Sequence, residues 1–279
     1  MSEEEKKCTG NCSSCGGKCE DEGERKMRLN LSRIKRKLVV MSGKGGVGKS
    51  TVAVNLAVGL AMEGFTVGLL DADFHGPSVP KMMNMENEQP VSDGEMIQPV
   101  AVGNIKVLSI GMMLGDPDAA VIWRGPMKIA VIKQLLGETA WGNLDFLVVD
   151  CPPGTGDEPL SVCQNLAEDG EAVIVTTPQQ VAASDVSKSL NFCNQLGFKV
   201  AGIVENMSTF ICPKCGEVTE IFSSGAGEAL AKKYQVPFLG KLPLDPAVCR
   251  GGDAGMPFVR LERSPSAEEF RKMIAKLLD

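Results

Sequence analysis

Short apolar runs and segments with helical spacing alternate along most of the chain. Buried strands are predicted at residues 37–41, 66–71, 145–150, 172–176 and 199–204, with shorter strands at 96–102 and 105–110. Helical spacing of apolar residues marks residues 52–62, 127–140, 184–196 and 266–279. Because strands that alternate with helices favour parallel pairing, the sequence predicts an α/β fold with a mostly parallel sheet and helices on both faces.

The last predicted helix, residues 266–279, has a single apolar stripe. Its polar face mixes acidic and basic side chains and lacks the basic excess that anionic lipid favours. We therefore expect this helix to pack against its own sheet and not against a membrane.

The N-terminal residues do not follow the alternating pattern. Residues 1–30 are charged, contain glycine and serine, and have almost no large apolar side chains before Met27. We predict that residues 1–30 form a cysteine-rich tail outside the packed core, and that residues 31–279 form one domain.

Composition narrows the classes of partner. The 279 residues carry a formal net charge of -6, and only 5% of them are aromatic, which argues against a nucleic-acid-binding surface. No apolar run approaches the length of a membrane span, and the charged start is unlike a signal peptide. We therefore expect a cytoplasmic location. Clusters among the ten cysteines then indicate metal binding more than disulfides.

One glycine-rich stretch predicts a phosphate-binding loop. G-K-G-G-V-G-K-S-T fits the pattern G-x-x-x-x-G-K-[ST], with an extra lysine after the first glycine. It lies between a predicted strand and a predicted helix, so the helix N-terminus adds a partial positive charge. Lys49 is expected to reach the β- and γ-phosphates, and Ser50 to bind Mg²⁺. The predicted nucleotide ligands are Gly43, Lys44, Gly45, Gly46, Val47, Gly48, Lys49, Ser50 and Thr51.

Carboxylates end two of the predicted strands. Asp71 and Asp73 follow the second strand, and Asp150 closes the most apolar one. In an open parallel sheet these ends face the same crevice as the phosphate loop. Asp150 alone would suit a turn or a helix cap, but beside a phosphate loop it is expected to act with magnesium. The glycine- and proline-rich residues 151–157 are expected to change shape when the γ-phosphate leaves.

A C-x-x-C pair forms one cysteine cluster. Cys212 and Cys215 supply two thiolates on a tight turn, whereas zinc and a four-iron cluster both take four ligands. Two chains related by a two-fold axis would supply four. Spacing alone leaves half of a zinc site and half of an iron–sulfur site equally open.

The second cluster lies in the tail. Four cysteines at spacings typical of a [4Fe–4S] site, with zinc as the alternative, are Cys8, Cys12, Cys15 and Cys19. The isolated Cys151, Cys163, Cys193 and Cys249 are expected to behave as small buried hydrophobic residues, with Cys151 held open as an oxidation-sensitive site.

Four further motifs follow the phosphate loop in a fixed order. They are D-A-D-x-x-G-P-S-x-P at residues 71–80, R-G-P-M at 124–127, D-x-P-P-G-T-G-D at 150–157 and C-P-K-C at 212–215. Over about residues 37–260 the chain resembles the Mrp/ApbC family of ATP-dependent iron–sulfur cluster carriers. That family belongs to the deviant Walker A class of P-loop ATPases, with MinD and the nitrogenase iron protein.

The resemblance implies roles for individual residues. Lys44 would reach the phosphates bound by a partner chain and, with Lys49, Asp73 and Asp150, would make up the catalytic set. Asp73 would position the attacking water, and Asp150 would be a second magnesium-linked acid. Asn206 would lie near adenine, with Pro243 and Asp245 lining the base.

The resemblance also implies an assembly and an activity. A homodimer would hold a bridging [4Fe–4S] cluster on Cys212 and Cys215, hydrolyse ATP and pass the cluster to apoproteins. Some relatives carry an N-terminal four-cysteine site with longer spacing, so the role of that site does not transfer directly. The alternatives are a positioning ATPase of the MinD or ParA type, a nitrogenase-like reductase and a zinc-bearing nucleotidase.

Overall fold

The computed structural model describes residues 22–114, 123–212 and 214–279. The four N-terminal cysteines, Cys8, Cys12, Cys15 and Cys19, lie outside these residues, so their predicted metal site stays a prediction.

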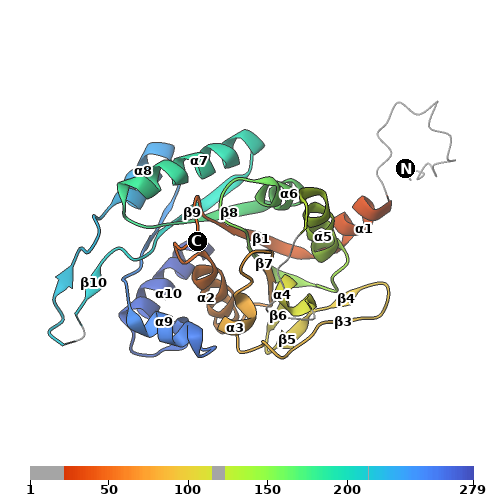
Figure 1. The fold of residues 1–279 in the computed structure, drawn as a ribbon, viewed down its shortest axis with the longest axis horizontal. Coiled ribbons are helices and arrows are strands. Elements are labelled where there is room, and N and C mark those ends of the chain that lie inside the picture. The colour runs from red at the N-terminus through yellow and green to blue at the C-terminus, as the bar shows by residue number, and fades with distance from the viewer. Residues whose placement is uncertain (1–21, 115–122, 213) are drawn as a thin grey trace.

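An eight-stranded sheet forms the centre of the molecule (Figure 1). In spatial order its strands are β12 (Phe238–Lys241), β9 (Lys199–Glu205), β8 (Gly170–Thr176), β1 (Ile34–Met41), β7 (Leu144–Asp150), β2 (Val67–Asp71), β6 (Ile105–Ser109) and β5 (Val100–Val102). Neighbouring strands are parallel except for β5 and β6. Two small hairpins pair β3 (Val91–Ser92) with β4 (Ile97–Gln98), and β10 (Phe210–Ile211) with β11 (Val218–Thr219).

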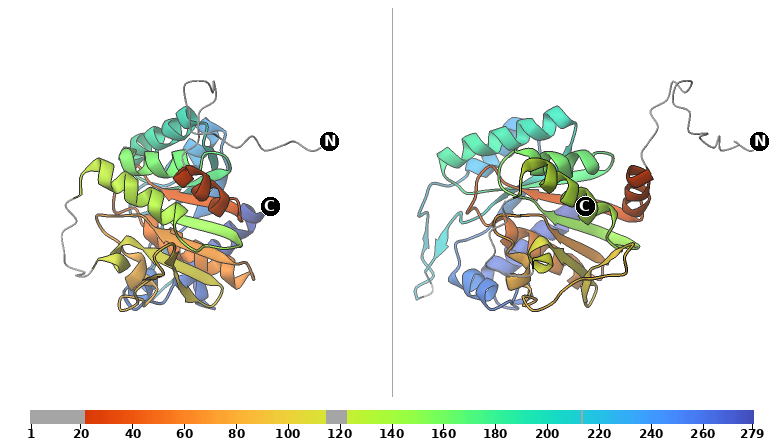
Figure 2. Two further views of the ribbon diagram at one scale, coloured as in Figure 1. Left: turned by 90° about the vertical axis from the view of Figure 1, so that its right-hand side faces the viewer. Right: turned by 45° about the vertical axis from the view of Figure 1, so that its right-hand side comes forward.

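Helices cover both faces of this sheet (Figure 1, Figure 2). One face carries α2 (Lys49–Met62), α3 (Val79–Met82), α9 (Pro246–Asp253), the 3-10 helix η1 (Phe258–Arg260) and α10 (Pro265–Leu278). The other carries α1 (Glu22–Leu31), α5 (Gly125–Gly137), α6 (Asp157–Asn165), α7 (Gln180–Leu196) and α8 (Ala226–Tyr234). The short α4 (Ile110–Met113) directly follows β6. The predicted α/β fold is confirmed.

Strand β1 shows why its apolar run is continuous. Leu38 and Val40 pack into the core on the α2 side, whereas Val39 and Met41 pack into the core on the α7 side. Because successive strand residues point to opposite faces, a strand covered on both faces needs apolar side chains at every position. The predicted final helix likewise packs on the sheet, with Phe270 and Ile274 of α10 buried in the core. None of the helices in the described residues is long and apolar enough to span a bilayer.

The predicted boundary of the N-terminal tail is wrong for residues 22–30. These residues belong to α1, which packs against α5. Asn30 is buried, and its amide donates to the carbonyl oxygens of Leu136, Gly137 and Thr139 at 3.3, 3.2 and 2.7 Å. Leu31 joins the core. The scarcity of apolar residues hid this contact, which rests on the buried Asn30 amide together with two apolar side chains, Met27 and Leu31.

Several other predicted elements differ in extent: β1 begins at Ile34, α5 ends at Gly137 and α7 begins at Gln180. Residues 96–102 form β4 and β5 as separate short strands, because β4 pairs with β3 outside the main sheet. Helix α2 begins at Lys49 instead of Val52, so its first turn includes the end of the phosphate loop.

Candidate functional site

The phosphate loop connects β1 to α2. Gly46 and Gly48 take positive φ angles of 78° and 85°, which a residue with a Cβ adopts only with strain. This backbone borders a cavity of about 210 Å³, and Asp73, Ser78, Met82 and Pro153 complete its wall. The loop residues that line the cavity are Ser42, Gly45, Gly46, Gly48, Lys49, Ser50 and Thr51. A concave loop at a helix N-terminus is the arrangement that binds phosphate.

Lys49 joins the phosphate loop to the carboxylates at the strand ends. Its Nζ lies 2.6 Å from Asp150 Oδ1 and 3.6 Å from Asp73 Oδ2. Burial lowers the pKa of Lys49, but the adjacent Asp150 carboxylate outweighs this and raises it overall, so the ammonium stays charged. The structure thus brings together Lys49, Asp73 and Asp150, as the sequence predicted.

Asp71 is a third buried carboxyl group at this edge of the sheet. It pairs in register with Asp150 on β7, accepts hydrogen bonds from the Asp73 and Val79 amides, and accepts a third from the Ser109 hydroxyl at 3.0 Å. Burial, followed by repulsion from Asp150, raises the pKa of Asp71 to about 7. The sequence motifs give Asp71 no separate role, although its place at the end of a strand marks it as a candidate.

The site has an acceptor suited to a cation. Burial raises the pKa of Asp150, the Lys49 ammonium opposes that rise, and its Oδ2 is one of two buried side-chain polar atoms without a partner among the described residues. The Ser50 hydroxyl accepts from Lys49 at 3.2 Å, beside the same carboxylate. Hydroxyl and carboxylate oxygens are hard ligands that Mg²⁺ prefers. The donor set therefore fits a magnesium ion held by Ser50 and supported by Asp150.

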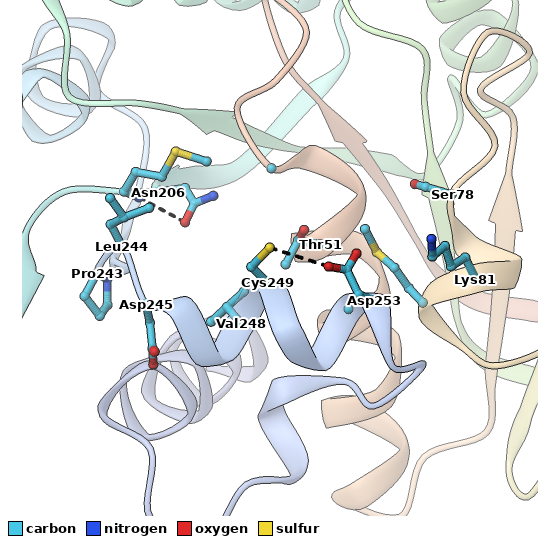
Figure 3. A pocket seen from close by; sticks show the side chains of 14 residues that line it. Thr51, Ser78, Lys81, Asn206, Pro243, Leu244, Asp245, Val248, Cys249 and Asp253 are labelled. Carbon is cyan, nitrogen blue, oxygen red and sulfur yellow. Dashed lines mark hydrogen bonds between the residues drawn. The ribbon is translucent and has the colours of Figure 1, made fainter. Parts of the chain in front are cut away.

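A second cavity of about 380 Å³ adjoins the phosphate loop (Figure 3). Asn206, Pro243 and Asp245, expected beside the base, all line it. The Asn206 amide donates to Val47 O at 2.8 Å and lies against Gly48, where a Cβ would approach its Nδ2 to 2.2 Å. The cavity thus opens directly from the end of the phosphate loop, as a base pocket would.

Asp245 lines this cavity, but its carboxylate does not point into it. Its Oδ1 accepts from the Ala247 amide at 2.8 Å, and Oδ2 accepts from the Ser266 hydroxyl at 2.8 Å. The carboxylate points away from the cavity in Figure 3 and caps α9. The wall also includes Lys81, Met82, Val248, Cys249 and Asp253, which sequence reasoning missed. They come from α3 and α9, and no local motif marks them.

Three of the predicted loop ligands, Gly43, Lys44 and Val47, do not line the phosphate cavity of their own chain. Val47 is buried in the core on the α2 side of the sheet. Gly43 packs closely against the backbone of Asp185 in α7, and Lys44 Nζ donates to Gln179 Oε1 at 3.4 Å. The extra lysine therefore lies, partly exposed, beside the N-terminus of α7 and outside the phosphate cavity of its own chain.

The C-x-x-C pair lies on the β10–β11 hairpin, which projects from the body of the molecule (Figure 1). Cys215 is exposed, and Cys212 is partly exposed. The amides of Cys215 and Lys214 hydrogen-bond the Cys212 sulfur and lower its pKa, which favours a thiolate. Within the described part of the chain, no group of three or more histidine, cysteine or acidic side chains is arranged to hold a metal. The pair therefore presents an incomplete set of ligands at a surface.

The isolated cysteines divide into two kinds. Cys151, Cys163 and Cys193 are buried as predicted, and burial raises the pKa of Cys163 to about 12 and that of Cys193 to about 11. Burial also raises the pKa of the Cys151 thiol, which disfavours the thiolate and argues against an oxidation-sensitive site. The prediction of a buried Cys249 is wrong. It is exposed on α9, and its thiol donates to Asp253 at the wall of the second cavity.

Comparisons with known proteins agree with this geometry. The family model described as ParA, the NUBPL iron-transfer P-loop NTPases, matches residues 33–278. The chain is 46% identical to an iron-sulfur cluster carrier protein of Methanocaldococcus jannaschii, over 98% of this chain and 97% of that protein. It is 48% identical to the cytosolic Fe-S cluster assembly factor CFD1 of Saccharomyces cerevisiae, over 78% and 76% of the two chains.

A solved structure is also similar to this one. The nucleotide-binding protein of Archaeoglobus fulgidus, in complex with ADP, superimposes with a TM-score of 0.76 at 41% identity. The match covers 88% of this chain and 96% of that one. The similarity therefore extends over the sheet, the phosphate loop and both faces of helices.

Proposed function

The chain belongs to the NUBPL-type family of iron-transfer P-loop NTPases, and from that premise we propose that it is an ATP-hydrolysing carrier that binds [4Fe–4S] clusters and passes them to apoproteins. The protein would carry the cluster, and ATP hydrolysis would supply the free energy. We further propose that it acts as a homodimer in the cytoplasm, consistent with the cytosolic name of the yeast relative.

One observation carries the proposal: the hairpin with the C-x-x-C pair grows out of the wall of the base pocket. Asn206 and Met207 line that pocket, and Cys212 follows a few residues later. The Ser208 amide donates to Leu242 O at 2.9 Å, and the Leu244 amide donates to Thr209 O at 2.6 Å. The hairpin base is thus hydrogen-bonded to the segment that lines the other side of the pocket. A nucleotide that moves either wall would move the cysteines.

The segment that follows β11 is linked by hydrogen bonds to the phosphate loop. Ser223 Oγ donates to Pro178 O at 2.7 Å, and the adjacent Gln179 accepts from Lys44. We propose that ATP draws Lys44 away from Gln179 toward the partner chain's phosphates. This movement would release one constraint on residues 178–179 and on the hairpin. Nucleotide state would then set the separation of the two C-x-x-C pairs that share a cluster.

The buried side chains suit the hydrolytic step. Lys49 would neutralise charge on the β- and γ-phosphates, and Asp73, at the edge of the same cavity, would orient the attacking water. A magnesium ion, when bound by Ser50, would supply charge neutralisation between the phosphates. Because Asp150 holds the Lys49 ammonium at 2.6 Å, the lysine is preorganised in the absence of nucleotide.

Anaerobic reconstitution with iron and sulfide tests the cargo. In a variant whose four tail cysteines, Cys8, Cys12, Cys15 and Cys19, are changed to serine, we expect a brown dimer with one [4Fe–4S] cluster per two chains. Adding Cys212→Ser should abolish that colour, whereas adding Cys249→Ser should leave it. Cys249 is a matched control because it too is an exposed cysteine but lies on α9. A colourless monomer loaded only with zinc would refute the proposal.

A transfer assay tests the link to ATP. The reconstituted protein is mixed with an apoprotein whose activity needs a [4Fe–4S] cluster, with or without ATP. We expect Asp73→Asn to bind ATP and keep its cluster but to lose the stimulation of transfer by ATP. Equal transfer rates for wild type and Asp73→Asn would show that hydrolysis and transfer are not coupled. ATP-dependent pelleting with liposomes or DNA would favour a positioning ATPase instead.

A further inference from the structure

We propose that Lys128 is a positioning residue for ATP hydrolysis, which fastens the loop that carries Asp73 to the helix that follows the Asp150 loop. The inference rests on the proposed ATPase activity and assigns it a residue outside the phosphate loop. Lys128 lies on α5, and nothing in the nucleotide-binding motifs includes it.

The Lys128 ammonium joins two segments that flank the γ-phosphate position. Its Nζ lies 2.7 Å from Glu158 Oε1 and 3.0 Å from His75 Nε2. Glu158 is the second residue of α6, directly after residues 151–156, and His75 follows Asp73 in the loop after β2. Three elements, α5, α6 and the Asp73 loop, therefore meet at one nitrogen atom.

The Lys128–Glu158 ion pair is largely buried, whereas His75 is exposed. The side chains of Lys128 and Glu158 are 10% and 16% exposed, and the Nζ also lies 6.0 Å above the ring of the buried Phe74. The Lys128 ammonium lowers the pKa of Glu158 against the opposing effect of partial burial. Moving a charged ammonium out of water costs free energy, and an apolar side chain would avoid that cost. A lysine at this position therefore points to a role that an apolar side chain could not fill.

The link reaches Asp73 through the backbone. The His75 amide donates to Asp73 Oδ1 at 3.2 Å, while the His75 ring accepts from Lys128 at Nε2. An ammonium only donates, so the ring nitrogen that faces it carries no proton. Phe74, which lies between Asp73 and His75 in the sequence, is buried in the core and packs edge-on against Trp123. Lys128 thus contacts Phe74 and His75, the two residues that directly follow Asp73 in this loop.

The consequence for catalysis is geometric. Asp73 must place a water in line with the γ-phosphate, and the 151–156 segment, whose Gly154 amide donates to Ser42 O, borders the same phosphate cavity. A displacement of about 1 Å in such a group lowers a rate by as much as about 100-fold. Neither the phosphate loop nor the base pocket contains Lys128, so nucleotide binding is expected to survive its loss.

The test compares Lys128→Met with Lys133→Met. Lys133 lies on the same helix, and its ion pair, with Glu24 at 3.7 Å, is exposed. We expect Lys128→Met to lower kcat at least about tenfold with KM for ATP changed less than about twofold, and Lys133→Met to match wild type. Thermal unfolding of each variant, with ADP titration by calorimetry, separates misplacement of Asp73 from loss of fold.

Substitutions of the partners keep the proposal testable if Lys128→Met does not fold. His75→Gln retains an acceptor oxygen and is expected to keep most of kcat, whereas His75→Leu removes the acceptor and is expected to lose it. Glu158→Gln should fall between the two, because an amide oxygen still accepts from Lys128. A wild-type kcat in His75→Leu or in Lys128→Met, or a loss that appears only in KM, would overturn the proposal. Wild-type protein without ATPase activity would overturn the proposed function and this inference with it.

Discussion

The buried Lys49 stabilises the folded protein even before nucleotide binds, and Lys49→Met tests this most directly. In the native protein the ammonium lies 2.6 Å from Asp150, which is fully buried, and faces Asp73 and Asp71 as well. Methionine is of similar length and leaves these carboxylates without a cation. Loss of one partner from a buried ion pair costs about 3–5 kcal/mol, so the nucleotide-free variant should lose that much free energy of unfolding.

The loss should depend on pH with a defined sign. Burial already raises the pKa of Asp71 to about 7 in the wild type, and loss of Lys49 would raise the pKa values of Asp71 and Asp150 further. Above about pH 4 these carboxyl groups are ionised in the unfolded chain. In the folded protein they stay protonated up to their raised pKa. The stability therefore falls as pH rises through this window. The cost of Lys49→Met should be full above about pH 8 and smaller near pH 5.5.

Urea denaturation without nucleotide, at both pH values, measures this cost. Lys37→Met is the matched control, because Lys37 is also buried, at 2%, but its partner Asp169 is 50% exposed and stays solvated when left alone. We expect the control to lose about 1 kcal/mol at either pH. In Lys49→Met/Asp150→Asn, removal of the unpaired carboxylate should restore at least half of the loss at high pH. The reasoning is refuted if Lys49→Met costs no more than Lys37→Met, or costs the same at both pH values.

Three further predictions concern the pocket, the thiols and α1. Gly48→Ala should weaken ADP binding in calorimetry about tenfold more than Gly46→Ala. Both glycines have positive φ, but only at Gly48 does a Cβ meet Asn206, and equal losses would contradict this. In metal-free native protein iodoacetamide should modify Cys215 and Cys249 rapidly, and peptide mapping should find the buried Cys163 alkylated only after unfolding. Asn30→Ala should lower the free energy of unfolding in urea by about 1–3 kcal/mol, and an unchanged midpoint would show that α1 is not anchored by its amide.

The sequence alone determined the features that depend on neighbouring residues. A phosphate loop is a run of backbone amides between a strand and a helix, so its pattern was sufficient to place Lys49 and Ser50. Strand alternation placed Asp73 and Asp150 at one edge of the sheet, because the carboxyl ends of parallel strands meet there. The tight spacing of Cys212 and Cys215 was likewise visible as a two-ligand site on a turn.

Only the tertiary structure decided which side chains from distant segments touch. Lys128 reaches His75 and Glu158 across separations of 53 and 30 residues, and no periodicity links those positions. The same holds for Cys249 at the wall of the base pocket and for the Asn30 amide that anchors α1 across more than a hundred residues. Such contacts arise when packed elements bring particular atoms within hydrogen-bonding distance, and that distance is a property of the whole fold.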